Sequence, residues 1–327
     1  MDISCAFATS LDTPEHIRVA EQLGYRRAWC YDSPALYPDV WMTLGRAAER
    51  TSTIGLGPGV LVPSLRHPMV NAAAIASLVA LAPGRVAVAI GAGFTGRYTL
   101  GQRAMRWAEV RDYVAVVRAL LQGDEAEWDG AVVRMIHPEG FVADRPVDVP
   151  ILIGADGPKG RAVAEELGDG LFSAGIPAPG EDGHRWRALL AFGTVRADGE
   201  ELTSDRVLAA AGPGLAVAYH AVYERGGAEN VDALPGGRSW REAVEAEPLR
   251  RRHLAVHDGH LVHVTDRDRD AVLEGAPLLS AVTFTGTATE LRERLEGLAA
   301  AGVSELAYQP AGPDIPGELE RLMAAVG

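Results

Sequence analysis

Short apolar runs alternate with amphipathic helical patterns from the first residues of the chain onward. This alternation is typical of βα units built around a parallel sheet. Thr13 and Pro14 supply a cap and a first helical position, and Gly24 ends that helix. The pattern predicts strands at 3–8, 27–31, 54–61 and 86–90, and helices at 13–24, 40–50, 69–81 and 104–121.

The second half of the chain repeats the pattern less regularly. Residues 126–135 alternate around Asp129-Gly130, a pair that favours a two-residue hairpin turn. Residues 176–187 contain two prolines and two glycines, which is too broken for a full helix. Further strands are predicted at 151–153, 170–173, 189–195 and 305–308, and further helices at 160–167, 202–223, 289–301 and 318–326.

The composition favours one large domain. With 327 residues and 47% hydrophobic side chains, the chain can bury a single extensive core. Its 37 glycines and 20 prolines are spread along the chain rather than gathered into a linker. We therefore interpret residues 1–327 as a single α/β domain with an irregular insertion at about 202–284, of which 224–284 shows no clear pattern.

Charge and cysteine content exclude several classes of function. The net charge of -13 opposes binding to nucleic acid or to an anionic membrane surface. No apolar run is long enough to span a bilayer, so we expect a cytoplasmic protein. Cys5 and Cys30, the only cysteines, are expected to be buried, inert thiols.

The histidines form no familiar metal motif. Residues 257–263 (HDGHLVH) are rich in imidazole, but they lie within the expected insertion. No HExxH or comparable spacing accompanies them, so we predict no metal site.

Two glycine-rich loops follow the third and fourth predicted strands. The segment GPGVLVPSLRHP (57–68) is either a tight strand-to-helix connection or a ligand site. In the second interpretation, Gly59 lets the backbone approach a planar ligand and His67 faces the mouth of a barrel. AIGAGFTGRYTLG (89–101) resembles a dinucleotide fingerprint only superficially, so a loop that makes room for a ring is favoured.

A third loop offers an anion site. GADGPKG (154–160) is an amide-rich turn that opens onto a helix N-terminus, where a phosphate is a natural ligand. Lys159 is the only lysine of the chain, although a solvated turn is the alternative interpretation. Asp32, at the end of the second strand, either projects toward the active end of a barrel or is a solvated, capping residue.

Taken in order, five segments resemble the luciferase-like superfamily of flavin and deazaflavin oxidoreductases. The resemblance leaves mainly residues 176–284 unmatched. The segments are WCYDSP (29–34), GPGVLVPSLRHP (57–68), LAPGRVAVAIGAG (81–93), GADGPKGRAVAEELGDG (154–170) and TGTATELRERLEGLAAAGVSELAYQPAG (285–312).

The resemblance implies a (β/α)8 TIM barrel, a homodimer and a cofactor ring lying over a backbone bulge after the third strand. A non-proline cis peptide is typical of that bulge, which maps here to Gly59-Val60. By the same resemblance, Asp32 and the loop of Gly91, Ala92 and Gly93 line the ring or its side chain. The residues implied to hold the phosphate are Ala155, Asp156, Gly157, Pro158 and Lys159.

The resemblance also implies a cofactor and a reaction. The RHP sequence with the Ala-rich helix after it, and the GPK turn, favour the branch that uses coenzyme F420, with FMN as the alternative. We expect hydride transfer between F420 and a small organic substrate. An FMN-dependent monooxygenase and a non-catalytic flavin-binding barrel stay open as alternatives.

The sequence departs from the family pattern at the positions where proton donors are expected. Many deazaflavin relatives carry a histidine directly after the second-strand aspartate, and some carry a carboxylate after the fourth strand. Ser33 and Phe94 or Thr95 stand in those places, so oxidation of a sugar phosphate is not expected. Asp32 and His67 are the candidate catalytic residues, with Arg97 or Tyr98 as further candidates.

Overall fold

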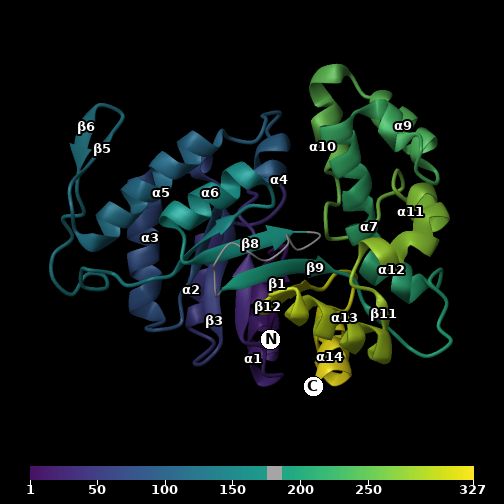
Figure 1. Ribbon diagram of the computed structural model, residues 1–327, viewed down its shortest axis with the longest axis horizontal. Helices are drawn as coiled ribbons and strands as arrows, with labels where there is room; N and C mark the ends of the chain where they lie inside the picture. The colour runs from purple at the N-terminus through teal and green to yellow at the C-terminus, as the bar shows by residue number, and fades with distance from the viewer. Residues whose placement is uncertain (175–185) are drawn as a thin grey trace. The chain divides into compact units, whose positions relative to one another are not determined.

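Eight parallel strands close into a barrel in the computed structural model, which describes residues 1–174 and 186–327 (Figure 1). Neighbouring strands follow the order β1-β12-β9-β8-β7-β4-β3-β2, which confirms the predicted TIM barrel. The barrel strands are β1 (Asp2–Phe7), β2 (Arg27–Cys30), β3 (Gly55–Leu61), β4 (Val88–Gly91), β7 (Ile151–Gly154), β8 (Gly170–Ala174), β9 (Arg187–Phe192) and β12 (Glu305–Gln309).

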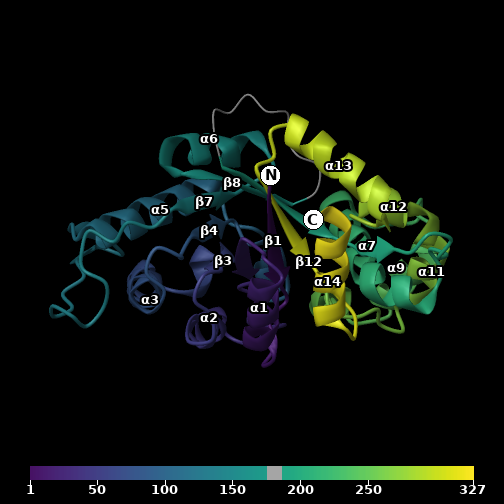
Figure 2. The same cartoon turned by 90° about the horizontal axis from the view of Figure 1, so that it is seen from below.

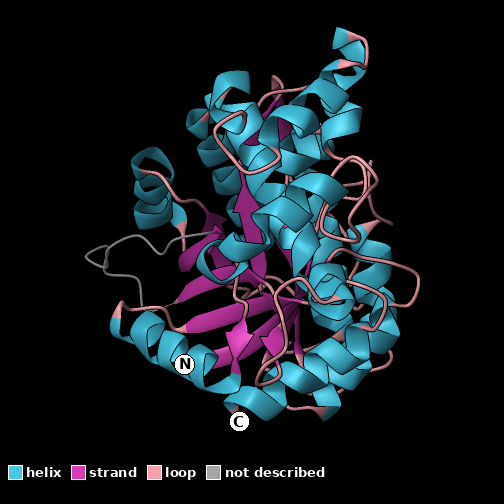
Figure 3. Ribbon diagram, turned by 90° about the vertical axis from the view of Figure 1, so that its right-hand side faces the viewer, coloured by secondary structure: helices cyan, strands magenta, loops and turns pink. Residues whose placement is uncertain are grey.

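Helices follow the first strands of the barrel and lie outside them (Figures 2 and 3). Asp39 begins α2 because its side chain accepts hydrogen bonds from the amides of Trp41 and Met42. The elements are α1 (Thr13–Gln22), α2 (Val40–Ala48), the 3-10 turn η1 (Pro63–Leu65), α3 (Pro68–Leu81), α4 (Phe94–Tyr98), α5 (Trp107–Gln122) and α6 (Pro158–Leu167).

The predicted hairpin is present as β5 (Ala126–Trp128) and β6 (Ala131–Val133), which pair antiparallel. Asp129 and Gly130 both have positive φ, at 50° and 77°, as a two-residue turn of this kind requires. The Trp128 ring packs edge-on against Tyr113 of α5, with ring centroids 5.7 Å apart. The hairpin is therefore held to the helix layer by an aromatic contact.

Two expectations about the middle of the chain need adjustment. The strand expected at 189–195 is β9, and it ends at Phe192 because Gly193 has φ of 149° and lies against the backbone of Phe284. The broken segment expected at 176–187 falls almost wholly on residues 175–185, which lie outside the described part of the chain.

The chain divides into two compact units. The first contains residues 1–97, 103–190 and 301–307, and the second contains 98–102, 191–300 and 308–327. The second unit is mainly helical, including residues 224–284, where the sequence gives no clear pattern. Its elements are β10 (Val195–Arg196), α7 (Asp205–Gly226), α8 (Ala228–Val231), α9 (Gly237–Glu245), η2 (Leu249–Arg251), α10 (Arg252–Val256), α11 (Arg269–Gly275), η3 (Ala276–Leu278), α12 (Leu279–Val282), β11 (Gly286–Thr287), α13 (Ala288–Ala300) and α14 (Ile315–Val326).

The core of the second unit forms around α7. Ser204 caps this helix by accepting a hydrogen bond from the amide of Val207. Leu215 and Tyr219 of α7 are buried with Trp240 of α9 and Leu279 of α12. The short helices are therefore stabilised by burial against α7 rather than by their own length.

Both cysteines are buried and free, as predicted, and burial raises the pKa of both thiols. Within residues 1–174 and 186–327, no helix has both the length and the apolar character needed to cross a membrane.

A buried carboxylate makes hydrogen bonds and an ion pair with residues at or near the start of two other barrel strands. Glu305, at the first position of β12, is 2% exposed and accepts hydrogen bonds from the indoles of Trp29 and Trp186, at 2.8 and 2.7 Å. The guanidinium of Arg27 lies 3.9 Å from the same carboxylate and stacks over both indole rings. Charge and hydrogen bonds thus join β2, β12 and the residue before β9.

We expect Glu305→Gln to destabilise the protein by about 3 kcal/mol, because the amide nitrogen cannot accept an indole hydrogen bond and Arg27 loses its counter-charge. Urea unfolding followed by tryptophan fluorescence measures this loss. The matched control is Glu296→Gln, at an exposed position of α13. Equal unfolding midpoints for the two variants would show that the Glu305 carboxylate contributes nothing to stability.

Candidate active site

A cis peptide bond joins Gly59 and Val60 near the carboxyl end of β3, as the resemblance implies. The register between β3 and β4 shifts at this point, between Gly59 and Leu61. A Cβ at Gly59 would lie 3.0 Å from Cε3 of Trp29 and 3.3 Å from Cζ of Phe172. The backbone of the bulge therefore rests directly on aromatic rings of the barrel interior.

Glycines of the neighbouring strands surround Val60. A Cβ at Gly154, the last residue of β7, would lie 2.6 Å from Cγ1 of Val60. A Cβ at Gly91, the last residue of β4, would lie 3.1 Å from Cγ2 of the same side chain. Gly93 has φ of 76°, and its missing Cβ leaves room for Val62. The structure thus brings the predicted residues Val60 and Gly91 together with Gly154 at the carboxyl ends of β3, β4 and β7.

The loop after β4 folds back over the ends of β2 and β3. A Cβ at Gly96 of α4 would lie 3.0 Å from the carbonyl oxygen of Asp32 and 3.5 Å from the hydroxyl of Ser33. The amide of Met105 then donates to the carbonyl of Ala92 at 2.9 Å, which closes the loop. Ala92 and Ser33 are buried. The loops after β2 and β4 therefore pack against each other.

Asp32 lies at the centre of a buried ion pair. Nη1 of Arg66 donates to both carboxylate oxygens of Asp32, at 2.8 and 2.7 Å, and Nη2 donates to Asp39 at 2.7 Å. The amide of Val62 adds a longer bond of 3.3 Å. Burial raises the pKa of Asp32, an effect that the bonds from Arg66 and Val62 oppose. Arg66 therefore holds a carboxylate that is 3% exposed in a fixed orientation.

Sequence reasoning missed Arg66, although it stands next to the candidate His67. Its ionic partner Asp32 lies 34 residues earlier, and neither spacing nor local pattern links the two. The available signal was an arginine directly before a helix start in a loop already suspected of binding a ligand.

His67 has a local structural role. It is the residue before α3, and its Nδ1 accepts a hydrogen bond from the amide of Met69 at 3.1 Å. The exposed ring lies edge-on to Trp128 of the hairpin, with centroids 6.2 Å apart. These contacts leave the Nε2 atom as the part of His67 that could act on a ligand.

The GADGPKG loop ends in an open helix N-terminus. Gly157 precedes α6 and has no side chain to cap it, and a Cβ there would meet open space. Pro158 occupies the first turn, and Lys159 beside it is exposed. Asp156 turns to accept a hydrogen bond from the amide of Ala174 at 3.0 Å. The amides of the first turn and the Lys159 ammonium are therefore the groups of this loop that could bind an anion.

The family model described as luciferase-like monooxygenase matches residues 9–305, and the chain belongs to this family. The chain is 29% identical over 309 residues to a 5,10-methylenetetrahydromethanopterin reductase from Archaeoglobus fulgidus, covering 91% of this chain and 90% of the relative. It is also 35% identical over 172 residues to an F420-dependent glucose-6-phosphate dehydrogenase from Beutenbergia cavernae. That match covers 47% of this chain and about half (49%) of the relative.

Solved structures share the fold at low sequence identity. An F420-dependent secondary alcohol dehydrogenase in complex with an F420-acetone adduct superposes with a TM-score of 0.68 at 18% identity, over 99% of this chain and 98% of that one. The oxygenating constituent of 3,6-diketocamphane monooxygenase from Pseudomonas putida, in complex with FMN, gives 0.60 at 15% identity, over 100% and 98%.

We expect Arg66→Ala to destabilise the protein by about 3 kcal/mol at pH 7, because Asp32 loses its buried partner. The folded chain then holds the Asp32 proton more tightly than the unfolded chain does. The stability of the Arg66→Ala variant, relative to wild type, therefore falls as pH rises above the ordinary carboxyl pKa of about 4. Urea unfolding at pH 4 and pH 7 measures the difference from wild type at each pH.

The smaller difference in stability between wild type and Arg66→Ala is expected at pH 4, because Asp32 of the variant then holds its proton and needs no counter-charge. The exposed Arg250 of η2 provides the control variant Arg250→Ala. An Arg66→Ala effect of equal size at both pH values would argue against the ion pair as its cause.

Proposed function

We propose that the protein transfers a hydride between coenzyme F420 and a small organic substrate. The single observation that carries this proposal is the convergence of the bulge at Gly59-Val60 with Gly91 and Gly154 at one end of the barrel. Membership in the luciferase-like family and the F420-dependent names of several relatives support the same cofactor.

The residues present fit a planar ring. Gly91 and Gly154 make room for the side chain of Val60, because a Cβ at either position would crowd it, and Val60 itself is only half-buried. A flat ring can therefore lie close to backbone at this surface. When bound, a deazaflavin supplies or accepts the hydride, and the protein contributes binding and orientation.

The loop before α6 fits the phosphate of the same cofactor. An open helix N-terminus and an adjacent ammonium both attract an anion, and Gly157 and Lys159 are exposed. Ala155 is buried and anchors the loop, while Gly157, Pro158 and Lys159 are exposed. We propose that the backbone amides of Gly157 and Lys159, together with the Lys159 ammonium, hold the phosphate.

Asp32 and His67 differ in the contacts that would allow acid or base chemistry. Because Arg66 occupies both oxygens of Asp32, we propose that Asp32 positions Arg66 and the end of β3 for a ligand. His67, through Nε2, is the proposed group that could orient or protonate a substrate. Arg97 and Tyr98, at the end of α4, stay alternative candidates. The predicted homodimer and the cytoplasmic location also stay predictions.

Fluorescence titration with F420, and separately with FMN, tests the cofactor and its phosphate site. Wild type should bind F420, and Lys159→Ala should weaken binding about tenfold to a hundredfold, since a charge-assisted bond is lost. Lys159→Arg keeps the charge and is the matched control. Unchanged affinity in Lys159→Ala would remove the phosphate site from the GPK turn.

The same titration separates the alternative functions. Binding of FMN alone, with oxygen consumption by the reduced flavin, would replace the proposal by the monooxygenase. Tight binding of F420 without reduction or oxidation of any organic acceptor or donor would favour a non-catalytic barrel.

We expect Gly154→Ala to weaken F420 binding about tenfold, because the new methyl group displaces Val60 from its position beside the ring, and about 1.4 kcal/mol corresponds to this change. The control is Gly297→Ala on α13, where a Cβ meets nothing within 4 Å and should slightly stabilise the helix. If Gly154→Ala binds F420 like wild type, the ring lies elsewhere.

A further inference from the structure

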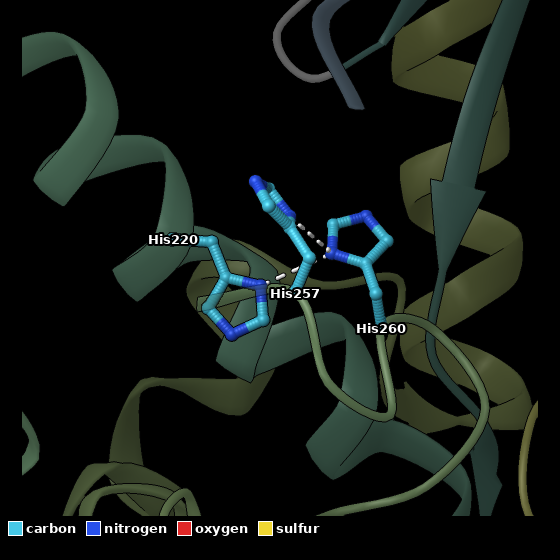
Figure 4. A group of neighbouring side chains, drawn as sticks. All are labelled: His220, His257 and His260. Carbon is cyan, nitrogen blue, oxygen red and sulfur yellow. Dashed lines mark hydrogen bonds between the residues drawn. The ribbon is translucent and has the colours of Figure 1, made fainter. Parts of the chain in front are cut away.

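Three histidines of the second unit converge on one point inside the protein. His220 lies on α7, His257 follows α10, and His260 lies three residues further along the chain (Figure 4). Their exposed fractions are 2%, 3% and 5%. Nδ1 of His260 lies 3.1 Å from Nδ1 of His220 and 3.3 Å from Nδ1 of His257.

Hydrogen bonds among the rings cannot account for this arrangement. A ring nitrogen carries at most one hydrogen or offers one lone pair, so Nδ1 of His260 can make one full bond to a neighbouring nitrogen. Both short contacts share this atom. A single cation, in contrast, accepts the lone pairs of all three rings.

The spacing matches a tetrahedral transition-metal ion. Zinc-nitrogen bonds of about 2.0–2.1 Å place two ligand nitrogens about 3.3–3.4 Å apart. One ring nitrogen from each of the three histidines lies within 4.8 Å of the others. Buried imidazole nitrogens are ligands preferred by Zn²⁺ and similar divalent ions over Mg²⁺ or Ca²⁺.

Carboxylates lie near the Nε2 atoms of two of the rings, on the side away from the shared Nδ1 contacts. Asp268 lies 3.7 Å from Nε2 of His220, and Glu224 lies 3.6 Å from Nε2 of His257. Neither Nε2 atom has a hydrogen-bond partner among the described residues. Protons on these nitrogens would face the carboxylates and leave the lone pairs on Nδ1 for a metal, the usual arrangement around metal-bound histidine.

The buried negative charge of Asp268 would be stabilised by a nearby cation. This side chain is 4% exposed, and its hydrogen-bond donors include the indole of Trp240 at 2.8 Å and the hydroxyl of Thr265 at 2.7 Å, both neutral. A divalent ion among the histidines would balance the two carboxylates through the rings between them.

The backbone around His260 is shaped for this placement. Gly259 and Leu261 both have positive φ, at 69° and 60°, a conformation that leucine rarely adopts. The amide of His260 donates to the carbonyl of His257 at 3.2 Å, so a tight turn carries both rings to the same side. Gln309 fixes the turn by donating to the carbonyl of Leu261 at 3.0 Å.

We propose that His220, His257 and His260 bind one divalent transition-metal ion of the Zn²⁺ class and so fasten the turn at 257–263 to α7. Three protein ligands leave a fourth position for water. The proposal is independent of the cofactor, because every residue in it belongs to the second unit.

Metal binding to the full chain, purified without a histidine tag and stripped with a chelator, tests this site. Wild type should take up one equivalent of Zn²⁺ with a rise in Tm, and Co²⁺ should give the visible absorption bands of a tetrahedral site. His260→Gln should abolish both. Glu224→Gln, which removes only a supporting carboxylate, should lower the affinity about tenfold to a hundredfold.

The exposed His263, in the same segment but outside the cluster, provides the control His263→Gln, which should bind like wild type. If His260→Gln does not fold by circular dichroism, the wild-type Co²⁺ spectrum and the Glu224→Gln affinity decide the question. Wild type that binds no Zn²⁺ after stripping, or a Co²⁺ spectrum without tetrahedral bands, would overturn the proposal.

Discussion

The carboxylate of Glu305 connects the stability of the barrel to the geometry of its opposite end. By accepting the indole hydrogen of Trp29, Glu305 fixes a ring that is fully buried. The other edge of this ring supports Gly59, where a Cβ would come within 3.0 Å. Phe172 packs edge-on against the same ring, with centroids 5.1 Å apart. The bulge at Gly59-Val60 therefore depends on a hydrogen bond made near the start of the strands.

Much of the fold could be predicted because it depends on local sequence. The period of apolar residues marks each barrel strand, and Asp129-Gly130 marks the hairpin, because both signals lie within a few residues. The short helices after α7 gave no such signal. They are short, and their buried residues pack into the core around α7.

The candidate sites also differ in whether their signal in the sequence is local. The glycine loops were recognisable because glycine itself marks a close backbone approach. Arg66 and the histidine cluster were not, because their partners are distant in sequence. Asp32 and Arg66 are 34 residues apart, and His220 and His260 are 40 apart. Only the folded chain shows that these side chains meet. The RHP and HDGHLVH segments alone do not indicate which distant residues they contact.

Lys159 has a consequence beyond its charge. It is the only lysine among 327 residues, and it is exposed at the start of α6. Apart from the α-amino group, it is the single primary amine of the chain. An amine-reactive dye or crosslinker would consequently label only this loop and the N-terminal amine, which gives the protein an attachment point for a spectroscopic reporter without any cysteine engineering.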